Sequence, residues 1–167
     1  MKENTRPLPL TAYLITGALM VAALLGFALL VRADVQRSRP VDATVYTEAV
    51  PAGLMWQLTE GGNEELITLD GHVLIAGEVI QWWKNHVALY DTQSGEYRQL
   101  STTMVCREEL ETVANDGINQ SYSGIAAMVR TEELTPPFSR YEICVLYETN
   151  HHNILVHTGQ MLKGGAA

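Results

Sequence analysis

The sequence predicts a mainly β protein, in which one N-terminal transmembrane α-helix is followed by a small antiparallel β-sandwich domain. Three observations lead to this prediction. An apolar stretch occupies residues 10–31, short apolar runs separated by turn residues follow it, and charge divides unevenly between the two parts. Residues 1–39 carry five Lys or Arg against two Asp or Glu, whereas residues 40–167 carry six against seventeen. Because the second part is acidic, nucleic acid and anionic lipid headgroups are disfavoured as partners.

The apolar stretch 10–31 has the length of a membrane span. No Asp, Glu, Lys or Arg occurs from Pro7 to Val31, and the stretch extends about 33 Å as a helix at 1.5 Å per residue. The hydrocarbon core of a bilayer is about 30 Å thick. The stretch is longer than the apolar region of a signal peptide, and it ends without a small-residue cleavage site. We therefore expect a retained anchor, preceded by a tail over residues 1–9.

The rest of the chain divides into a stalk, a domain and a tail. Residues 32–63 are expected to form a juxtamembrane stalk and the first strands, residues 64–163 the β-sandwich, and residues 164–167 a flexible tail. Short apolar runs between turn residues indicate strands. They place strands at 45–47, 54–58, 65–70, 73–81, 86–91, 96–100, 123–130, 140–148, 153–157 and 161–163.

Smaller features refine this prediction. The polar loops 92–95 and 149–152 predict two tight hairpins, and residues 106–112 favour a short helix. In the strand 140–148, alternate side chains form the candidate core face, namely Tyr141, Ile143, Val145 and Tyr147.

A series of strand motifs runs from about Val73 to Leu162. A glycine-bearing strand leads to a Val-x-Leu-Tyr hairpin, then to an arginine with an acidic and an aliphatic residue after it. An aromatic-x-Gly strand and a Tyr-x-Ile-x-Val-Leu-Tyr strand follow, with Thr-Gly further on. The residues are Ile75 to Ile80, Val87 to Leu100, Arg107 with Glu109 and Leu110, Tyr122 to Gly124, Tyr141 to Tyr147, and Thr158-Gly159.

This order resembles an extracytoplasmic β-sandwich domain of Gram-positive membrane proteins that are associated with cell-surface glycan and glycopolymer assembly. The sequence departs from the pattern at Glu78, where an aromatic residue is common; Trp82 and Trp83 come four residues later. The resemblance implies an extracytoplasmic domain in the cell membrane and offers no catalytic residues.

Arguments about orientation oppose one another. Arg32, Arg37 and Arg39 follow the helix, so the positive-inside rule by itself places the C-terminal domain in the cytoplasm. The acidic composition of the domain, a candidate disulfide and the resemblance favour the outside. We expect the C-terminal domain to be extracytoplasmic.

Two groups of residues are candidates for contacts. Ala18, Ala22 and Gly26 recur every four residues and share one helix face, where small side chains let another helix approach; chance composition is the alternative. Trp82 and Trp83 are candidates for a ligand or partner surface, since exposed Trp stacks on sugars and is enriched at interfaces. The alternative is one core Trp and one rim Trp, because neighbouring strand residues point to opposite faces.

The sequence has two cysteines and a group of histidines near its end. Cys106 and Cys144 form a candidate disulfide if the domain lies outside, and two buried free thiols are the equal alternative. His151, His152 and His157 are weak candidates for a zinc site. Solvated turn histidines are the favoured interpretation, so we expect no metal and no cofactor.

Catalytic motifs are absent from the sequence. No nucleophile elbow and no phosphate-binding glycine loop occurs. The leading hypothesis is therefore a non-catalytic accessory protein that partners a polytopic membrane protein in cell-envelope glycan assembly, a pathway suggested only by the resemblance. The alternative is a stand-alone surface carbohydrate-binding or sensing module, and a His-metal enzyme ranks last.

Overall fold

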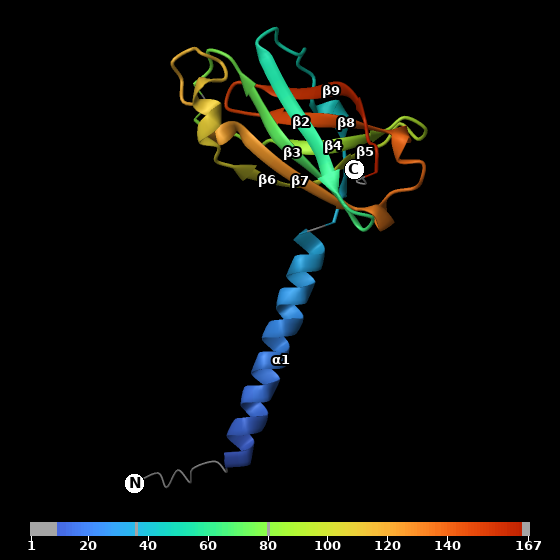
Figure 1. Cartoon of the computed structure of the whole chain (residues 1–167). Helices are drawn as coiled ribbons and strands as arrows, with labels where there is room; N and C mark the ends of the chain where they lie inside the picture. Colours follow the sequence, from blue (N-terminus) through green and yellow to red (C-terminus); the bar gives the residue numbers. More distant parts are fainter. Residues whose placement is uncertain (1–9, 36, 80, 165–167) are drawn as a thin grey trace. The chain divides into compact units, whose positions relative to one another are not determined.

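A computed structural model describes residues 10–35, 37–79 and 81–164 (Figure 1). The tail expected at residues 1–9 and most of the tail expected at 164–167 lie outside the described residues. The chain divides into two compact units, Met1–Val35 and Gln36–Ala167. Each unit is described by itself.

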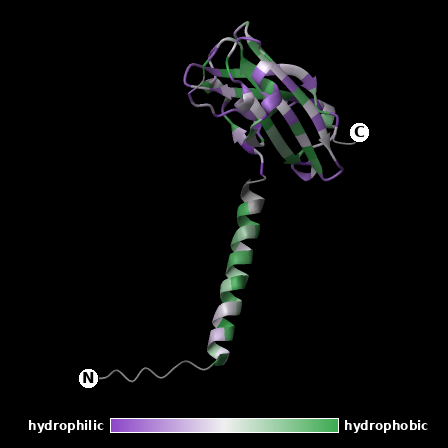
Figure 2. Cartoon of the chain, turned by 60° about the vertical axis from the view of Figure 1, so that its left-hand side comes forward, coloured by the Kyte–Doolittle hydropathy of each residue, from purple (hydrophilic) through white to green (hydrophobic). Residues whose placement is uncertain are grey.

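The first unit contains the helix α1, Leu10–Val35. Its segment Leu10–Val31 is long and apolar enough to cross a membrane, and Figure 2 shows hydrophobic residues along most of its length. Apolar side chains are exposed along this segment, for example Leu14, Leu24 and Leu30. The prediction of one N-terminal apolar helix of membrane-spanning length is confirmed.

The second unit consists of two antiparallel sheets that pack face to face (Figure 1). The five-stranded sheet has the order β1-β5-β4-β8-β9, and the four-stranded sheet has the order β2-β3-β7-β6. The predicted fold class, mainly β with a small antiparallel β-sandwich, is confirmed. The strands are β1 Arg39–Val41, β2 Leu54–Gly62, β3 Leu66–Ile75, β4 His86–Asp91, β5 Tyr97–Gln99, β6 Ser101–Val105, β7 Gly124–Arg130, β8 Tyr141–Glu148 and β9 Asn153–Met161.

The main core lies between the two sheets. Alternate residues of β8 enter it, and Ile143, Val145 and Tyr147 are fully buried there while Tyr141 is 5% exposed. The predicted core face of this strand is therefore confirmed. Burial of such side chains is the dominant favourable term in folding. Other core residues come from both sheets, among them Leu58, Ile67, Leu69, Val73, Val87, Leu89, Ile125, Val129, Ile154 and Val156.

A second, smaller apolar layer covers the outer face of the five-stranded sheet. It contains the β4 and β8 residues Ala88, Cys144 and Leu146. The chain between β1 and β2 packs against it through Tyr46, whose hydroxyl donates to the Glu148 carboxylate at 2.7 Å. Residues expected on the solvent side of β8 are therefore partly covered by the segment expected to be a stalk.

Three strand predictions need correction. Residues 45–47 do not form a strand; the 3₁₀ helix η1, Ala43–Val45, begins where Asp42 accepts a hydrogen bond from the Thr44 N–H. The strands expected at 65–70 and 73–81 are one strand, β3, which ends at Ile75; Ile80 of the expected strand lies outside the described residues. Those expected at 153–157 and 161–163 are also one strand, β9, which continues through Gly159.

The strand β6 was missed by the sequence analysis. It follows β5 after a single residue, Leu100, at which the chain passes from one sheet to the other. The Leu100 N–H donates to the Val87 carbonyl at 2.8 Å, and its side chain enters the main core. No turn residue marks this crossing, and the sequence Ser101 to Thr103 lacks the apolar alternation of a strand.

The two predicted hairpins and the short helix are confirmed. The loop 92–95 joins β4 to β5, and Gly95 takes the positive φ of 76° that glycine adopts without steric cost. The loop 149–152 joins β8 to β9, where the Thr149 N–H donates to the His152 carbonyl at 2.9 Å. The expected helix at 106–112 is the 3₁₀ helix η2, Glu108–Thr112, with Leu110 buried.

Candidate ligand-binding pocket

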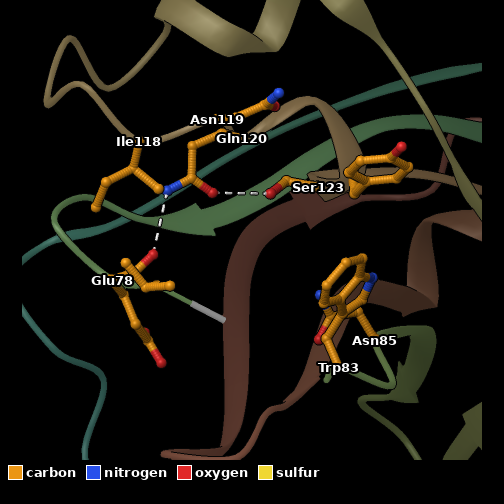
Figure 3. Close-up of a pocket in the computed structure, with 9 residues that line it drawn as sticks. Glu78, Trp83, Asn85, Ile118, Asn119, Gln120 and Ser123 are labelled. Carbon is orange, nitrogen blue, oxygen red and sulfur yellow. Dashed lines mark hydrogen bonds between the residues drawn. The ribbon is translucent and has the colours of Figure 1, made fainter. Parts of the chain in front are cut away.

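A pocket of about 120 Å³ opens where two loops of the sandwich meet (Figure 3). One loop joins β3 to β4, and the other joins β6 to β7. The lining combines two aromatic rings, three side-chain amides, two aliphatic residues, a hydroxyl and a carboxylate. The lining residues are Trp83, Tyr122, Asn85, Asn119, Gln120, Val79, Ile118, Ser123 and Glu78.

Asp116 ties the β3–β4 loop to the β6–β7 loop. One oxygen of its carboxylate accepts from the Gly77 N–H at 2.7 Å, and the other accepts from the Ile118 N–H at 2.9 Å. These backbone hydrogen bonds lower the pKa of Asp116. Gly77 adopts a φ of 80°, a conformation in which a side chain would be strained. This turn ends the strand earlier than the sequence suggested and brings Glu78 to the pocket.

Arg107 holds the β6–β7 loop in place. Its backbone N–H donates to the Ser121 carbonyl at 2.7 Å, at the start of the 3₁₀ helix η3, Ser121–Ser123. Its guanidinium forms an ion pair with Asp70 of β3, and this carboxylate raises the pKa of the arginine. The loop that presents Tyr122 is thereby fixed to the four-stranded sheet.

Two aromatic rings form one wall of the pocket. The centroids of Trp83 and Tyr122 lie 6.1 Å apart, with the ring planes tilted by 43°. Trp83 pairs with Thr149 in an isolated β-bridge, while Tyr122 is 56% exposed. Trp82 is 53% exposed and does not line the pocket. The two neighbouring Trp side chains therefore lie in different surroundings.

Amide groups supply hydrogen-bonding capacity to the pocket. Gln120 and Asn85 are each 3% exposed. The Gln120 amide donates to the Glu78 carbonyl at 3.5 Å and accepts from the Ser123 hydroxyl at 3.2 Å, as the dashed lines in Figure 3 show. The side-chain oxygen of Asn85, Oδ1, accepts from the Glu148 backbone N–H at 3.2 Å. These contacts orient both amides before any ligand arrives.

Glu78 is the one carboxylate among the described residues that line the pocket. One of its oxygens accepts from the Thr149 hydroxyl at 3.4 Å. The other lies 3.6 Å from His152 Nε2, is buried, and makes no hydrogen bond. On the far side of the imidazole, His152 Nδ1 lies 3.0 Å from the Glu48 carboxylate. The imidazole is thus placed between two carboxylates.

The structure does not bring the three candidate histidines together. His151 is exposed and lies in the β8–β9 turn, where its backbone N–H donates to the Thr149 hydroxyl. His152 contacts Glu48 and Glu78 as described. His157 lies on β9, where its Nε2 is 3.1 Å from the Tyr97 hydroxyl. A metal site built from all three histidines is therefore not formed.

Cys106 and Cys144 are free thiols in the structure. Cys106 is exposed and follows β6 of the four-stranded sheet, whereas Cys144 is buried in the apolar layer on the outer face of the five-stranded sheet. The candidate disulfide is not formed, because the two side chains belong to different sheets and Cys144 points away from the sheet interface. Burial raises the pKa of the Cys144 thiol to about 12.

The small residues of α1 lie on one face, as their spacing requires. Ala18, Ala22 and Gly26 are all helical and exposed. A Cβ added at Gly26 would meet no atom within 4 Å. The side chains of the helix itself therefore leave open space at Gly26.

Comparison with known proteins gives no match. No family model matches the chain, and no curated protein and no solved structure matches it.

Trp83 was a candidate from the sequence, but its partners in the pocket were not. Tyr122 belongs to a strand motif, yet nothing in the sequence placed it beside Trp83, 39 positions earlier. Asn85 and Gln120 are isolated amides in polar loops, and such residues carry no spacing signal. The site forms only when the fold brings two loops together.

Proposed function

We propose that this chain is a non-catalytic, single-pass membrane protein whose β-sandwich binds one sugar ring, or the end of a glycan, in the pocket beside Trp83. The observation that carries the proposal is the combination of an aromatic wall with oriented amides in one pocket. Sugars present an apolar ring face together with hydroxyl groups that donate and accept hydrogen bonds. Aromatic rings offer a complementary apolar face, while amides both donate and accept.

The size of the pocket limits the ligand. Pockets for drug-sized molecules occupy roughly 300–1,000 Å³, whereas this one measures about 120 Å³. It therefore suits one ring or a chain end better than an oligosaccharide lying in a groove. The exposed ring of Tyr122 at the pocket offers a surface for the neighbouring unit of a longer glycan.

The composition of the pocket supports binding rather than hydrolysis. A glycosidase uses two carboxyl groups that face each other across the scissile bond. Among the described lining residues, Glu78 is the one carboxylate, and it contacts Thr149 and His152. A ligand held here would meet an aromatic wall and amides but not the paired acids that cleavage requires.

Binding is tested on the full-length chain, purified in mild detergent, with a panel of mono- and oligosaccharides. Tryptophan fluorescence and calorimetry report the complex. Replacing the stacking ring in W83A should weaken binding by about 10-fold or more, equivalent to about 1.4 kcal/mol. The matched control is W82A, which removes a neighbouring exposed Trp that does not line the pocket, and it should bind as the native chain does.

Two results would contradict the proposal. The first is a glycan panel that produces neither heat nor a fluorescence change with the native chain. The second is a loss of binding in W82A that W83A does not share. Circular dichroism of both variants establishes that the sandwich remains folded.

We further propose that α1 anchors the protein in the cell membrane with the sandwich outside, the location that the resemblance over Val73 to Leu162 suggests. Exposed Cys106 provides a reporter, since Cys144 is buried. A membrane-impermeant maleimide should label Cys106 in intact cells, and C106S should abolish this labelling. Labelling that occurs only after lysis would place the sandwich in the cytoplasm.

A second function, accessory subunit of a polytopic membrane protein, is favoured by one observation on the helix. Ala18, Ala22 and Gly26 present a small-residue face of the kind at which transmembrane helices approach closely. Co-purification in mild detergent should recover a stoichiometric integral-membrane partner. Replacing Ala22 by Leu should release that partner, whereas replacing Leu24 by Ile should retain it. Recovery of the native chain without a companion would contradict this role.

A further inference from the structure

Three side chains with metal-binding atoms converge on the outer face of the five-stranded sheet. They are Glu142 and Cys144 of β8 and His157 of β9, and one ligand atom from each lies within 4.8 Å of the other two. The chemistry is mixed: a carboxylate oxygen, a thiol sulfur and an imidazole nitrogen. Zn²⁺ accepts all three donor types with tetrahedral geometry.

The strand pairing explains why these side chains meet. Glu142 and Cys144 are two positions apart on β8, so they share one face of the sheet. Cys144 lies directly opposite His157 in the antiparallel ladder. The register then shifts between Glu142 and Cys144, and Gly159 adopts a φ of 72° within this irregularity. Its N–H turns toward Glu142 and donates to Oε1 at 2.9 Å.

The distances fit a metal ion. Cys144 Sγ and His157 Nδ1 are 3.6 Å apart, and tetrahedral Zn²⁺ with ordinary bond lengths separates sulfur and nitrogen by about 3.6 Å. His157 Nδ1 and Glu142 Oε2 are 2.9 Å apart, whereas the ion would require about 3.4 Å. Without the ion this pair shares a hydrogen bond, so loading the site needs a movement of about half an ångström.

Neighbouring groups already hold the ligands with the correct atoms turned inward. The Tyr97 hydroxyl lies 3.1 Å from His157 Nε2, which leaves Nδ1 for the site. The Gly159 N–H occupies Oε1 of Glu142, which leaves Oε2. Contacts of this kind orient metal ligands, and their loss commonly costs 10- to 100-fold in metal affinity.

From this geometry we propose that Glu142, Cys144 and His157 bind one Zn²⁺ ion, with Tyr97 as a positioning residue. The site does not depend on the proposed glycan pocket, because it shares no residue with that pocket. Cys144 is buried, Glu142 is 15% exposed and His157 is 43% exposed. The fourth coordination position therefore opens on the His157 side, where water or a ligand group completes the tetrahedron. Bound zinc deprotonates a coordinating thiol, so the Cys144 proton leaves for solvent. His157 binds through Nδ1 as the neutral tautomer, with its proton on Nε2 facing the Tyr97 hydroxyl.

The test uses the full-length chain in detergent, stripped of metal with a chelator and titrated with Co²⁺. The expected result is one Co²⁺ per chain, with a thiolate-to-cobalt charge-transfer band that Zn²⁺ abolishes. C144S should lose this band, and H157Q should weaken binding at least 10-fold. Y97F keeps the apolar ring and should weaken binding about 10-fold. The matched control is C106S, which removes the exposed thiol and should retain the band.

Three outcomes overturn the proposal. One is the absence of a saturable charge-transfer band in the native chain. Another is a band lost in C106S and kept in C144S, which assigns the metal to the exposed cysteine. The third is native-like metal affinity in both H157Q and Y97F. These two variants alter partly exposed side chains, so they remain informative if C144S does not fold.

Discussion

Replacing Gly71 by Ala should strongly destabilise the sandwich. Gly71 lies within β3, where β2 and β7 pair with it on both sides. A Cβ placed on Gly71 would lie 1.8 Å from the Gln57 carbonyl oxygen, whereas real Cβ atoms essentially never approach within 3.0 Å. The two backbones must therefore separate by more than about 1 Å, as a carbonyl cannot rotate out of a ladder without losing its own hydrogen bond.

The magnitude follows from the hydrogen bonds that this separation breaks. A ladder bond of about 2.9 Å would stretch beyond the useful range, and each lost bond costs about 0.5–1.5 kcal/mol. Two or three bonds around Leu58 and Gly71 are affected. Ala recovers about 0.5–1 kcal/mol of backbone entropy relative to Gly. The free energy of unfolding should thus fall by about 2 kcal/mol, a large share of the 5–15 kcal/mol typical of a domain.

Urea denaturation followed by tryptophan fluorescence measures this change. All three Trp residues lie in the sandwich unit, so the signal reports that unit. The matched control is G53A, where an added Cβ would make only ordinary contacts, at 3.6 Å from Ile75 Cγ2 and 3.7 Å from the Ala76 carbonyl oxygen. Equal unfolding midpoints for G71A and G53A would refute the reasoning.

Three further predictions concern the ion pair, the thiols and the core. Asp91 accepts two hydrogen bonds from Arg140, at 2.8 and 2.6 Å, and these lower the pKa of Asp91 from 3.8 to about 2. The ion pair therefore stabilises the fold above about pH 4. This stabilisation is lost as the pH falls toward 2. Urea unfolding at pH 6, 4 and 2 should show this loss in the native chain and a flatter profile in D91N, and parallel profiles would contradict it. Without reductant, a thiol reagent should titrate one cysteine in the folded chain, the exposed Cys106, and two in denaturant; no reactive thiol in denaturant would reveal a disulfide. Ile143→Ala should lower the free energy of unfolding by about 2–5 kcal/mol, since the side chain is fully buried, and a change below 1 kcal/mol in denaturation would count against the assigned core.

Local signals predicted the parts of the fold that depend on local chemistry. Uninterrupted apolar composition over residues 10–31 gave the helix, and alternation along β8 gave the core face of Tyr141 to Tyr147. Both hairpins were marked by polar loops. β3 was predicted as two strands because a glycine between apolar runs, here Gly71, is typical of a turn. In the structure Gly71 lies within the strand and allows the β2 backbone to approach closely.

The candidate zinc site could have been predicted from the sequence, although it was not. The hairpin loop 149–152 sets Glu148 opposite Asn153, and the same register sets Cys144 opposite His157. The Glu-x-Cys spacing of β8 then adds the third ligand on the same face. Instead, the three histidines near the C-terminus were considered together as a candidate site, and the structure places them in different surroundings.

Composition and periodicity by themselves determined that this protein has one membrane-length helix and a strand-built acidic domain, because both properties are set by neighbouring residues. Which side chains meet was decided only by the tertiary structure. The pocket joins Glu78 and Trp83 of one loop to Tyr122 of another, and the chain changes sheets at Leu100 without a turn signal. Such contacts depend on long-range packing between the two sheets. A periodic sequence pattern reflects only neighbouring residues, so it does not predict contacts between residues that are distant in sequence.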